Sequence, residues 1–444
     1  MASGVRRVAL ASSAGNAVEL YDFLLYGTAS ALVFDELFFP SFDPRVGTLL
    51  AFATFGAGFL ARPLGGVVIG HFGDRVGRRA MLVLTLTATG VCTALIGLLP
   101  GYSSIGIAAP LLLVLLRVLQ GFFLGGEQGG ATLMAVEHAP PGRTAWYGSW
   151  TFLGSPLGLL LANGAMAASA AVSGDAFTDW GWRVPFLLSL VLVGVGLYLR
   201  LSVEESPVFR EARDRAGAVR LPIAVVLRDS WRRVLLGAGV NLGFNAFIFV
   251  VVTFAVSYGT RQLGVPRGTL LTAGLLGSAA QAAAILVFAR RADRVGRLPV
   301  MLGGAVFQAV WAFPLFWLLE TGSTGLVVLS VVVAMAGAAA LFGPMAAYYA
   351  ELFGPRVRYS GVSLSYQLGA VLGGGLSPFV ATWLLGATPG GASWPISLYL
   401  VGGAVVSALC LLAIGETLRR GPDEGVPDPG VGSAPGPTPD PAPR

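Results

Sequence analysis

Twelve long apolar stretches decide what this chain can fold into. They begin near residues 8, 46, 80, 105, 145, 182, 233, 267, 298, 324, 360 and 393. A helix of about 20 apolar residues crosses a bilayer core about 30 Å thick, so each stretch can span a membrane. The chain is 55% hydrophobic and 12% charged, whereas soluble domains carry about 25% charged residues. We therefore predict an all-α membrane protein with twelve transmembrane helices in the lipid bilayer.

The positions of the basic residues predict the topology. All 29 basic residues are arginine, and 23 of them fall on cytoplasmic segments if both termini are placed inside. This is the distribution that the positive-inside rule describes. The net charge of +6 thus indicates membrane orientation, and we expect no nucleic-acid partner. We expect a multi-pass protein of the cell membrane with both termini cytoplasmic.

The two halves of the chain repeat one another. GDRVGRR at 73–79 recurs as ADRVGRL at 292–298, and RTAWYG at 143–148 is echoed by RVRYSG at 356–361. Parallel six-helix repeats, related by a pseudo-twofold axis along the membrane normal, are typical of two-bundle secondary transporters. We predict an N-terminal bundle over 1–201, a cytoplasmic central loop over 202–232 and a C-terminal bundle over 233–418. The Pro- and Gly-rich segment 419–444 cannot bury a core, so we predict a disordered tail.

The first apolar stretch contains two acids, Glu19 and Asp22, one helical turn apart. Tyr26 lies on the same helical face. An acid near the centre of a membrane helix costs about 2.5–3.5 kcal/mol on insertion scales, which favours a functional role. Two interpretations stay open: proton or substrate coupling, and a buried ion pair that only fixes helix packing.

Arg117 in the fourth stretch is the expected partner of these acids. It lies near mid-depth, where a guanidinium could hold the acids deprotonated or bind a substrate carboxylate bidentately. A role in helix packing is the alternative for Arg117. Gln120, one helical turn further on, is assigned to the same substrate site. Glu127 is a second candidate for proton coupling, and we expect it to pair with Arg62 in the second stretch.

The short loops between helices are candidates for gating. An acid in such a loop could dock against the unpaired amides at the start of a helix in the other half. Arginines in these loops also serve topology, so gating is an additional role. The residues assigned to gating are Arg62, Asp74, Arg75, Gly77, Arg78, Asp293 and Arg297.

The C-terminal half offers neutral polar groups where the N-terminal half offers charges. We expect these side chains to orient a substrate by hydrogen bonds, although each alone is as compatible with an interhelical hydrogen bond. The residues assigned to substrate binding in this half are Asn241, Asn245, Tyr348 and Gln367.

Several motifs carry a family resemblance. GNAVELYDFLLYG, RPLGGVVIGHFGDRVGRR, RVLQGFFLGGEQGGA and ELFGPRVRYSGVSLSYQLGAVLGGGLSPF together cover helices 1, 2, 4 and 11. The chain resembles the major facilitator superfamily, and within it the metabolite:proton symporters that carry shikimate, 2-oxoglutarate, citrate, proline or betaine. The family usually has Trp where Leu20 stands, off the face that carries the two acids. The tail lacks the coiled-coil extension of osmosensing members, which makes an osmolyte carrier less expected.

The resemblance and the residues together predict proton-coupled uptake of a small organic acid, a carboxylate, by alternating access. A proton-coupled antiporter that exports drugs or metabolites is the alternative within the same class. A membrane-embedded enzyme or receptor is the alternative from another class, but the sequence shows no nucleophile arrangement or soluble catalytic domain. Two cysteines in apolar stretches and no phosphate loop predict no metal and no cofactor. We expect a monomer.

Overall fold

The computed structural model describes residues 2–40, 44–201, 222–355, 357–388 and 391–417, and the chain there is helical apart from turns and short connections. Eleven long helices begin within about three residues of the predicted positions, and the first begins earlier, at Ala2. In the described chain, nine helical segments are long and apolar enough to cross a membrane. The helices α1 and α3 and the shorter apolar α8 complete the predicted twelve spans, because each lies alongside these segments in one of the two bundles.

The N-terminal bundle packs six long helices against one another. They are α1 (Ala2–Leu32), α3 (Pro44–Val76), α4 (Arg78–Leu98), α6 (Ala108–Glu137), α7 (Thr144–Ser173) and α8 (Arg183–Leu201), with α2 (Phe34–Phe38), α5 (Tyr102–Ile105) and η1 (Gly174–Phe177) in the connections.

The C-terminal bundle repeats this arrangement, although two of its spans are broken. Its elements are α11 (Trp231–Phe249), η2 (Val250–Phe254), α12 (Ala255–Arg261), α13 (Arg267–Val295), α14 (Arg297–Glu320), α15 (Thr324–Leu352), α16 (Arg358–Ala370), η3 (Val371–Gly375), α17 (Ser377–Ala387) and α18 (Trp394–Ile414). The short α10 (Pro222–Asp229) precedes them, within the predicted central loop. Residues 202–221 of that loop and the predicted tail from 419 onward lie outside the described residues.

The breaks η2 and η3 are π-helical turns, which the sequence analysis did not predict. They interrupt the seventh and eleventh spans, so that the seventh span consists of α11, η2 and α12 and the eleventh of α16, η3 and α17. The run of glycines in η3 explains the second break, because glycine weakens a regular helix. Single-turn π segments are frequent at functional sites.

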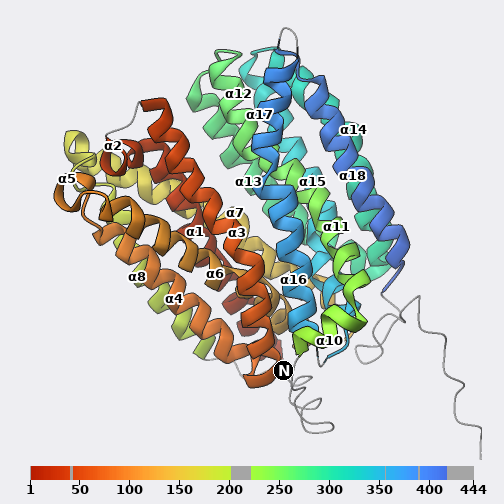
Figure 1. Ribbon diagram of the computed structural model, residues 1–444. Coiled ribbons are helices and arrows are strands. Elements are labelled where there is room, and N and C mark those ends of the chain that lie inside the picture. The colour runs from red at the N-terminus through yellow and green to blue at the C-terminus, as the bar shows by residue number, and fades with distance from the viewer. Residues whose placement is uncertain (1, 41–43, 202–221, 356, 389–390, 418–444) are drawn as a thin grey trace, which may run out of the picture.

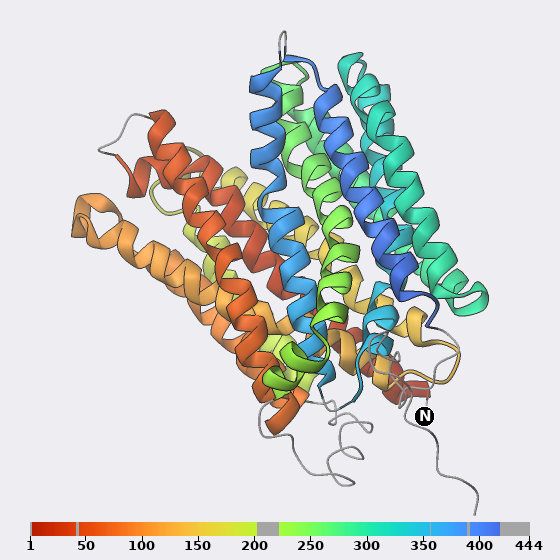
Figure 2. The ribbon, with the colours of Figure 1, turned by 45° about the vertical axis from the view of Figure 1, so that its right-hand side comes forward.

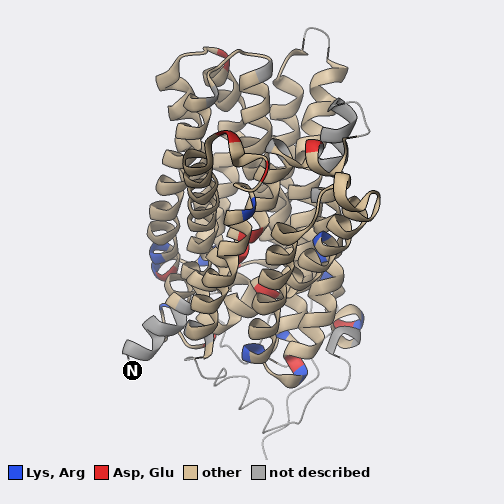
Figure 3. Ribbon diagram, turned by 90° about the vertical axis from the view of Figure 1, so that its left-hand side faces the viewer, with Lys and Arg blue, Asp and Glu red and all other residues tan. Residues whose placement is uncertain are grey.

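The two bundles converge at one end of the molecule and diverge toward the other (Figures 1 and 2). The converging end carries the α3–α4 and α13–α14 turns, the start of α1 and the end of α18. We call it the inner end, because the arginine distribution predicts that it faces the cytoplasm, and we call the opposite end the outer end. Charged residues gather at the inner end, and a smaller group lies at mid-height (Figure 3).

Glycines allow α3 and α6 to pack closely. A Cβ atom on Gly121 would lie 2.0 Å from the carbonyl oxygen of Gly58, and one on Gly125 would lie 2.1 Å from that of Arg62. Small residues commonly permit such backbone contact between membrane helices. The contact places the buried arginine of α6, Arg117, directly against α3, 2.8 Å from the position of a Cβ on Gly58.

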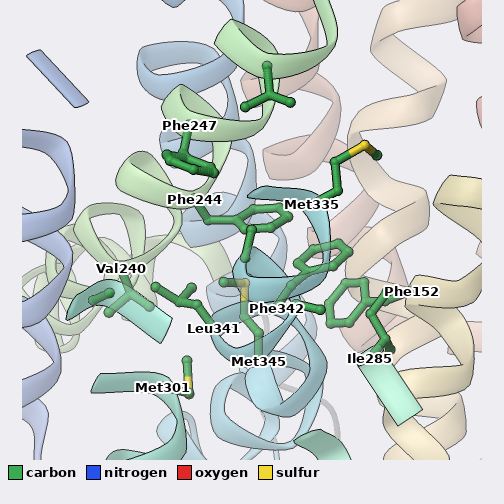
Figure 4. Close-up of a cluster of buried hydrophobic side chains, with 14 of the residues drawn as sticks. Phe152, Val240, Phe244, Phe247, Ile285, Met301, Met335, Leu341, Phe342 and Met345 are labelled. Atoms are coloured by element: carbon green, nitrogen blue, oxygen red, sulfur yellow. The ribbon is translucent and has the colours of Figure 1, made fainter. Parts of the chain in front are cut away.

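An aromatic cluster joins the two bundles between the inner end and mid-depth. Phe152 of α7 lies 4.1 Å, between ring centroids, from Phe342 of α15, which in turn stacks on Phe244 of α11 at 4.2 Å. Figure 4 shows these rings pointing toward one another within the buried apolar core of the C-terminal bundle. Further toward the outer end, Phe59 of α3 meets Phe249 of α11 at 5.7 Å. Apolar contact between the bundles therefore extends from the inner end to about mid-depth.

Candidate functional site

Asp74, at the inner end of α3, binds the start of α16 in the other bundle. Its carboxylate accepts hydrogen bonds from the Tyr359 amide at 3.1 Å, the Ser360 amide at 2.9 Å and the Ser360 hydroxyl at 2.8 Å. Gly73 makes room, because a Cβ there would lie 1.9 Å from the Tyr359 ring. We call this set the first inner contact. Here the acid satisfies amides that a helix start leaves unpaired.

An ion-pair cluster surrounds the first inner contact. Arg78 forms a buried salt bridge with Glu137 of α6, and Arg358 of α16 donates to the same Glu137 carboxylate at 3.0 Å. Gly77 allows the sharp α3–α4 turn with φ of 131°, a value that favours glycine. Arg75 is exposed, so its side chain points away from the cluster, which favours topology alone as its role.

Asp293 makes the corresponding contact in the repeat. Its carboxylate accepts hydrogen bonds from the amides of Ala145 at 2.9 Å and Trp146 at 2.8 Å, at the start of α7. The Arg290 guanidinium lies 3.7 Å from the centroid of a Trp146 ring. We call this set the second inner contact. It matches the first in geometry, although the sequence motif around Asp293 lacks the final arginine.

Arg297 supports the second inner contact as Arg78 supports the first. It lies 3.4 Å from Asp293, donates to Glu351 at 3.1 Å and also donates to Thr144 of the other bundle. Two carboxylates at the inner ends of α6 and α15, Glu137 and Glu351, therefore hold the two arginines in place.

Arg117 is fully buried at the centre of the N-terminal bundle. It donates to the side-chain oxygen of Gln120, whose amide donates to the Thr93 hydroxyl of α4 at 2.8 Å. The guanidinium lies 4.2 Å from the ring centroid of Phe23 and 4.3 Å from that of Tyr26. Aromatic faces stabilise a cation in this geometry. The predicted substrate residues Arg117, Gln120 and Tyr26 are thus brought together.

Arg62 contacts the Phe23 ring that Arg117 also contacts. Its guanidinium is 4.1 Å from the centroid of Phe23 and 4.6 Å from that of Phe59. Glu19 is its electrostatic partner, and Tyr366 of α16 interacts with both charges across the bundle interface. The structure therefore places Arg62 in the central charge cluster, at a distance from the inner contacts with which the sequence analysis grouped it.

Asp22 is buried, with 1% of its surface exposed. Its carboxylate oxygens make no hydrogen bond to the described residues, and the Thr93 hydroxyl is one of the groups of α4 that face it. The direct pairing of Asp22 with Arg117 that the sequence suggested was wrong. Gln120 and Thr93 lie between them instead, because Asp22 points toward α4, where the Thr93 hydroxyl accepts from Gln120 and donates to the backbone carbonyl of Thr89 at 3.0 Å.

Glu127 is also completely buried. It accepts a hydrogen bond from the Thr85 hydroxyl of α4 at 2.5 Å. The expected Glu127–Arg62 pair was wrong, because Glu127 lies on the face of α6 that packs against α4, and the electrostatic partner of Arg62 is Glu19.

Neutral residues of the C-terminal bundle reach toward this cluster. Asn245 donates to the Asn241 side chain at 2.7 Å, and Asn241 donates to the backbone carbonyl of Tyr366 at 2.8 Å. Gln367 donates across the interface to the carbonyl of Gly125 at 2.9 Å. Asn241 and Asn245 therefore hold Tyr366, the residue that faces the N-terminal charges. Tyr348, in contrast, donates to the carbonyl of Gly415 at the inner end, which favours a packing role.

Sequence reasoning missed several residues of these clusters. The echo around residues 143–148 and 356–361 could have revealed two of them, because Glu137 and Glu351 each stand seven residues before the first residue of the next helix. No sequence signal identified the apolar and hydroxyl members. The missed residues are Phe23, Phe59, Thr85, Thr93, Glu137, Glu351 and Arg358, whereas Tyr366 was expected among the neutral polar groups of the C-terminal half. Within the described ranges, no group of three His, Cys, Asp or Glu side chains could hold a metal ion.

Comparison with known proteins decides the family. A sequence model of the Major Facilitator Superfamily matches residues 43–364. The chain belongs to the Major Facilitator Superfamily. It is 42% identical to the shikimate transporter of Escherichia coli (strain K12) over 94% of this chain and 96% of that protein. It is 33% identical to the proline/betaine transporter of the same organism, over 94% and 84%.

The fold has a clear experimental counterpart. The proton:xylose symporter XylE from E. coli, bound to 6-bromo-6-deoxy-D-glucose, superposes with a TM-score of 0.78 at 17% identity, covering 94% of this chain and 97% of that one. The predicted superfamily fold and the resemblance to metabolite symporters are confirmed. This superfamily member is a multi-pass membrane transporter and not an enzyme.

Proposed function

We propose that this transporter takes up a small organic acid together with protons by alternating access. The observation that carries the proposal is the buried row of hydrogen bonds from Arg117 through Gln120 to Thr93, whose hydroxyl faces the buried Asp22 carboxylate. It links a cation suited to a carboxylate with an acid suited to a proton. The shikimate transporter relative supports an anionic substrate, since shikimate is a carboxylate.

Arg117 is the proposed carboxylate site. The rings of Phe23 and Tyr26 and the side chain of Gln120 fix the guanidinium at mid-depth. Because the fork is held in one orientation, little side-chain entropy is lost when a carboxylate binds it. Tyr366, presented by Asn241 from the C-terminal bundle, supplies a hydroxyl from the opposite side.

Asp22 is the proposed proton site, with Glu19 and Glu127 as further acids of the same bundle. A carboxylate bound to Arg117 changes the electrostatic field along the chain to Asp22. Substrate and proton together then favour the state that switches, since a ligand shifts a conformational equilibrium only through its differential affinity for the two states.

The two inner contacts are the proposed gate. They join the bundles at the inner end, and the bundles diverge at the outer end, so we assign the structure to an outward-facing state. Switching requires α16 to leave Asp74 and α7 to leave Asp293. Arg78 and Arg297 position these acids, whereas Arg75 has no part in the gate. We propose that the protein is a monomer in the inner membrane and that its inner end faces the cytoplasm.

Asp22→Asn in proteoliposomes tests the coupling. We expect it to abolish substrate-driven proton uptake and uphill accumulation while retaining substrate exchange, because exchange needs no net proton movement. Proton uptake is measured by external pH change, with a proton ionophore as control. Intact proton uptake in Asp22→Asn would remove Asp22 from the mechanism.

Arg117→Lys tests the substrate class. The ammonium group lacks the bidentate geometry of the guanidinium, so we expect binding of an anionic substrate to weaken by about 10- to 100-fold. Uptake of labelled organic acids and betaines by the purified protein provides the panel. Unchanged affinity in Arg117→Lys would indicate a zwitterionic or uncharged substrate instead.

A further inference from the structure

Three threonines line one face of α4. Thr85, Thr89 and Thr93 stand four residues apart, which is about 6 Å along a helix, and none exposes more than 1% of its surface. Thr87, between them, lies off this face and donates to the Val83 carbonyl at 2.7 Å. Within the face, Thr93 donates to the Thr89 carbonyl at 3.0 Å, and Thr85 lies 3.2 Å from the Leu82 carbonyl. We call the three buried residues the threonine seam.

The seam ends at the two acids of the N-terminal bundle that face α4. Its inner member, Thr85, donates to Glu127 at 2.5 Å. Its outer member, Thr93, faces Asp22 and accepts from Gln120. Two other groups face Asp22, namely the Cys92 thiol of α4 and the neighbouring phenol Tyr21, whose hydroxyl is bound to the carbonyl of Pro185.

Polar groups in the middle of the seam and at its outer end are open to a further hydrogen-bond partner. The Thr89 hydroxyl is buried and makes no hydrogen bond to the described residues, and the same holds for both oxygens of Asp22. A hydroxyl accepts and donates at once, so it can receive one proton while giving up another. Steps of about 6 Å between hydroxyls are too long for a direct hydrogen bond, and a water can bridge such a distance.

We propose that Asp22 and Glu127 exchange the transported proton along the threonine seam. This inference rests on the proposed symport function. The proton leaves the Asp22 carboxyl and passes through Thr93, Thr89 and Thr85 with bridging water. It ends on the Glu127 carboxylate, and each hydroxyl is neutral before and after the step. Arg117, connected through Gln120 to Thr93, places the substrate at the outer end of this path.

The position of Glu127 gives the path an exit. Gly125 and Gly126, the residues just before it, are bound by Gln367 and Tyr359 of the C-terminal bundle, each at 2.9 Å. These two contacts belong to the interface that opens when α16 leaves the inner end. Opening therefore uncovers the α6 segment next to Glu127, where the proton can be released inward.

Thr89→Val is the decisive variant, because it keeps the shape of the side chain and removes the hydroxyl. We expect substrate-driven proton uptake in proteoliposomes to fall by on the order of 10²-fold, a usual contribution of one positioned proton-transfer group, while substrate exchange continues. Thr89→Ser retains the hydroxyl and Thr87→Val lies off the seam, so both should behave as the unaltered protein. Thr85→Val detaches Glu127 and should reproduce the loss seen in Thr89→Val.

Infrared titration of the buried carboxyls separates this inference from the proposed function, because it needs no transport. In the purified protein, Asp22→Asn should change the titration of Glu127, and Thr89→Val should remove that dependence. Independent titration of the two acids in the unaltered protein would overturn the seam, as would normal proton uptake in Thr89→Val. Absence of any substrate-linked proton movement would instead overturn the proposed symport and leave the infrared result to decide the seam.

Discussion

The two bundles share a backbone plan and an inner contact, but they differ at mid-depth. Arg62 in α3 interacts with Glu19, and Gln281 in α13 stands 219 residues later, the same separation as between Asp74 and Asp293. Gln281 is buried to a similar extent. The N-terminal bundle thus holds charges at a level where the C-terminal bundle holds a neutral amide.

This difference separates two tasks. Buried charges are costly to remove from water, so they need fixed partners and a rigid surrounding. Concentrating them in one bundle lets the other bundle move against it without carrying a charge across the interface. The inner contact occurs in both halves of the repeat, because in each half a carboxylate binds the backbone amides at the start of a helix in the other bundle.

The largest expected effect comes from making the first half resemble the second. Arg62→Gln removes the electrostatic partner of Glu19 and should lower the free energy of unfolding by about 3–5 kcal/mol, because a buried charge is then left uncompensated. Denaturant titration in detergent micelles measures this change. The double variant Arg62→Gln with Glu19→Gln should recover most of the loss, and equal destabilisation of the single and double variants would contradict the pairing.

A smaller effect is expected at the inner contacts. Asp74→Asn should weaken hydrogen bonds to a charged acceptor, worth about 1.5–3 kcal/mol, and raise the inward-facing population by about 10- to 100-fold. Distances between spin labels at the exposed Arg75 and Arg294 report this population. Asp293→Asn should have the lesser effect, because the Asp293 carboxylate accepts two hydrogen bonds, whereas the Asp74 carboxylate accepts three. The reverse order would show that the second contact dominates the gate.

The smallest effect concerns a feature of the second contact alone. Trp146→Leu removes the interaction with Arg290, which at a partly exposed site is worth about 0.5–1 kcal/mol, and should shift the same population by about two- to fivefold. Arg290→Gln should produce an equal shift, and the double variant should add nothing further. Additive shifts would mean that the two side chains act separately.

Much of the fold was predictable because membrane helices follow simple local rules. Apolar length located the long helices, and the repeat located Asp74 and Asp293 in equivalent turns. The exceptions are the π-helical breaks after Phe249 and Ala370, which depend on packing between spans. For the candidate site, residue type and depth identified Arg117, Asp22 and Glu127. Their partners could not be predicted, because α6 contacts α3, α4 and α1, and the sequence does not show which side of α6 faces which neighbour.

The sequence alone determined that the chain spans a membrane, that its halves repeat, and that acids and arginines lie at mid-depth in the first half only. These properties follow from composition and spacing. The tertiary structure decided which side chains meet: Glu19 faces Arg62, Glu127 faces Thr85, and Asp22 faces Thr93, to which Gln120 links Arg117. The reason is physical, since the rotation of each helix about its axis is set by glycine contacts and aromatic packing between helices, which no single helix encodes.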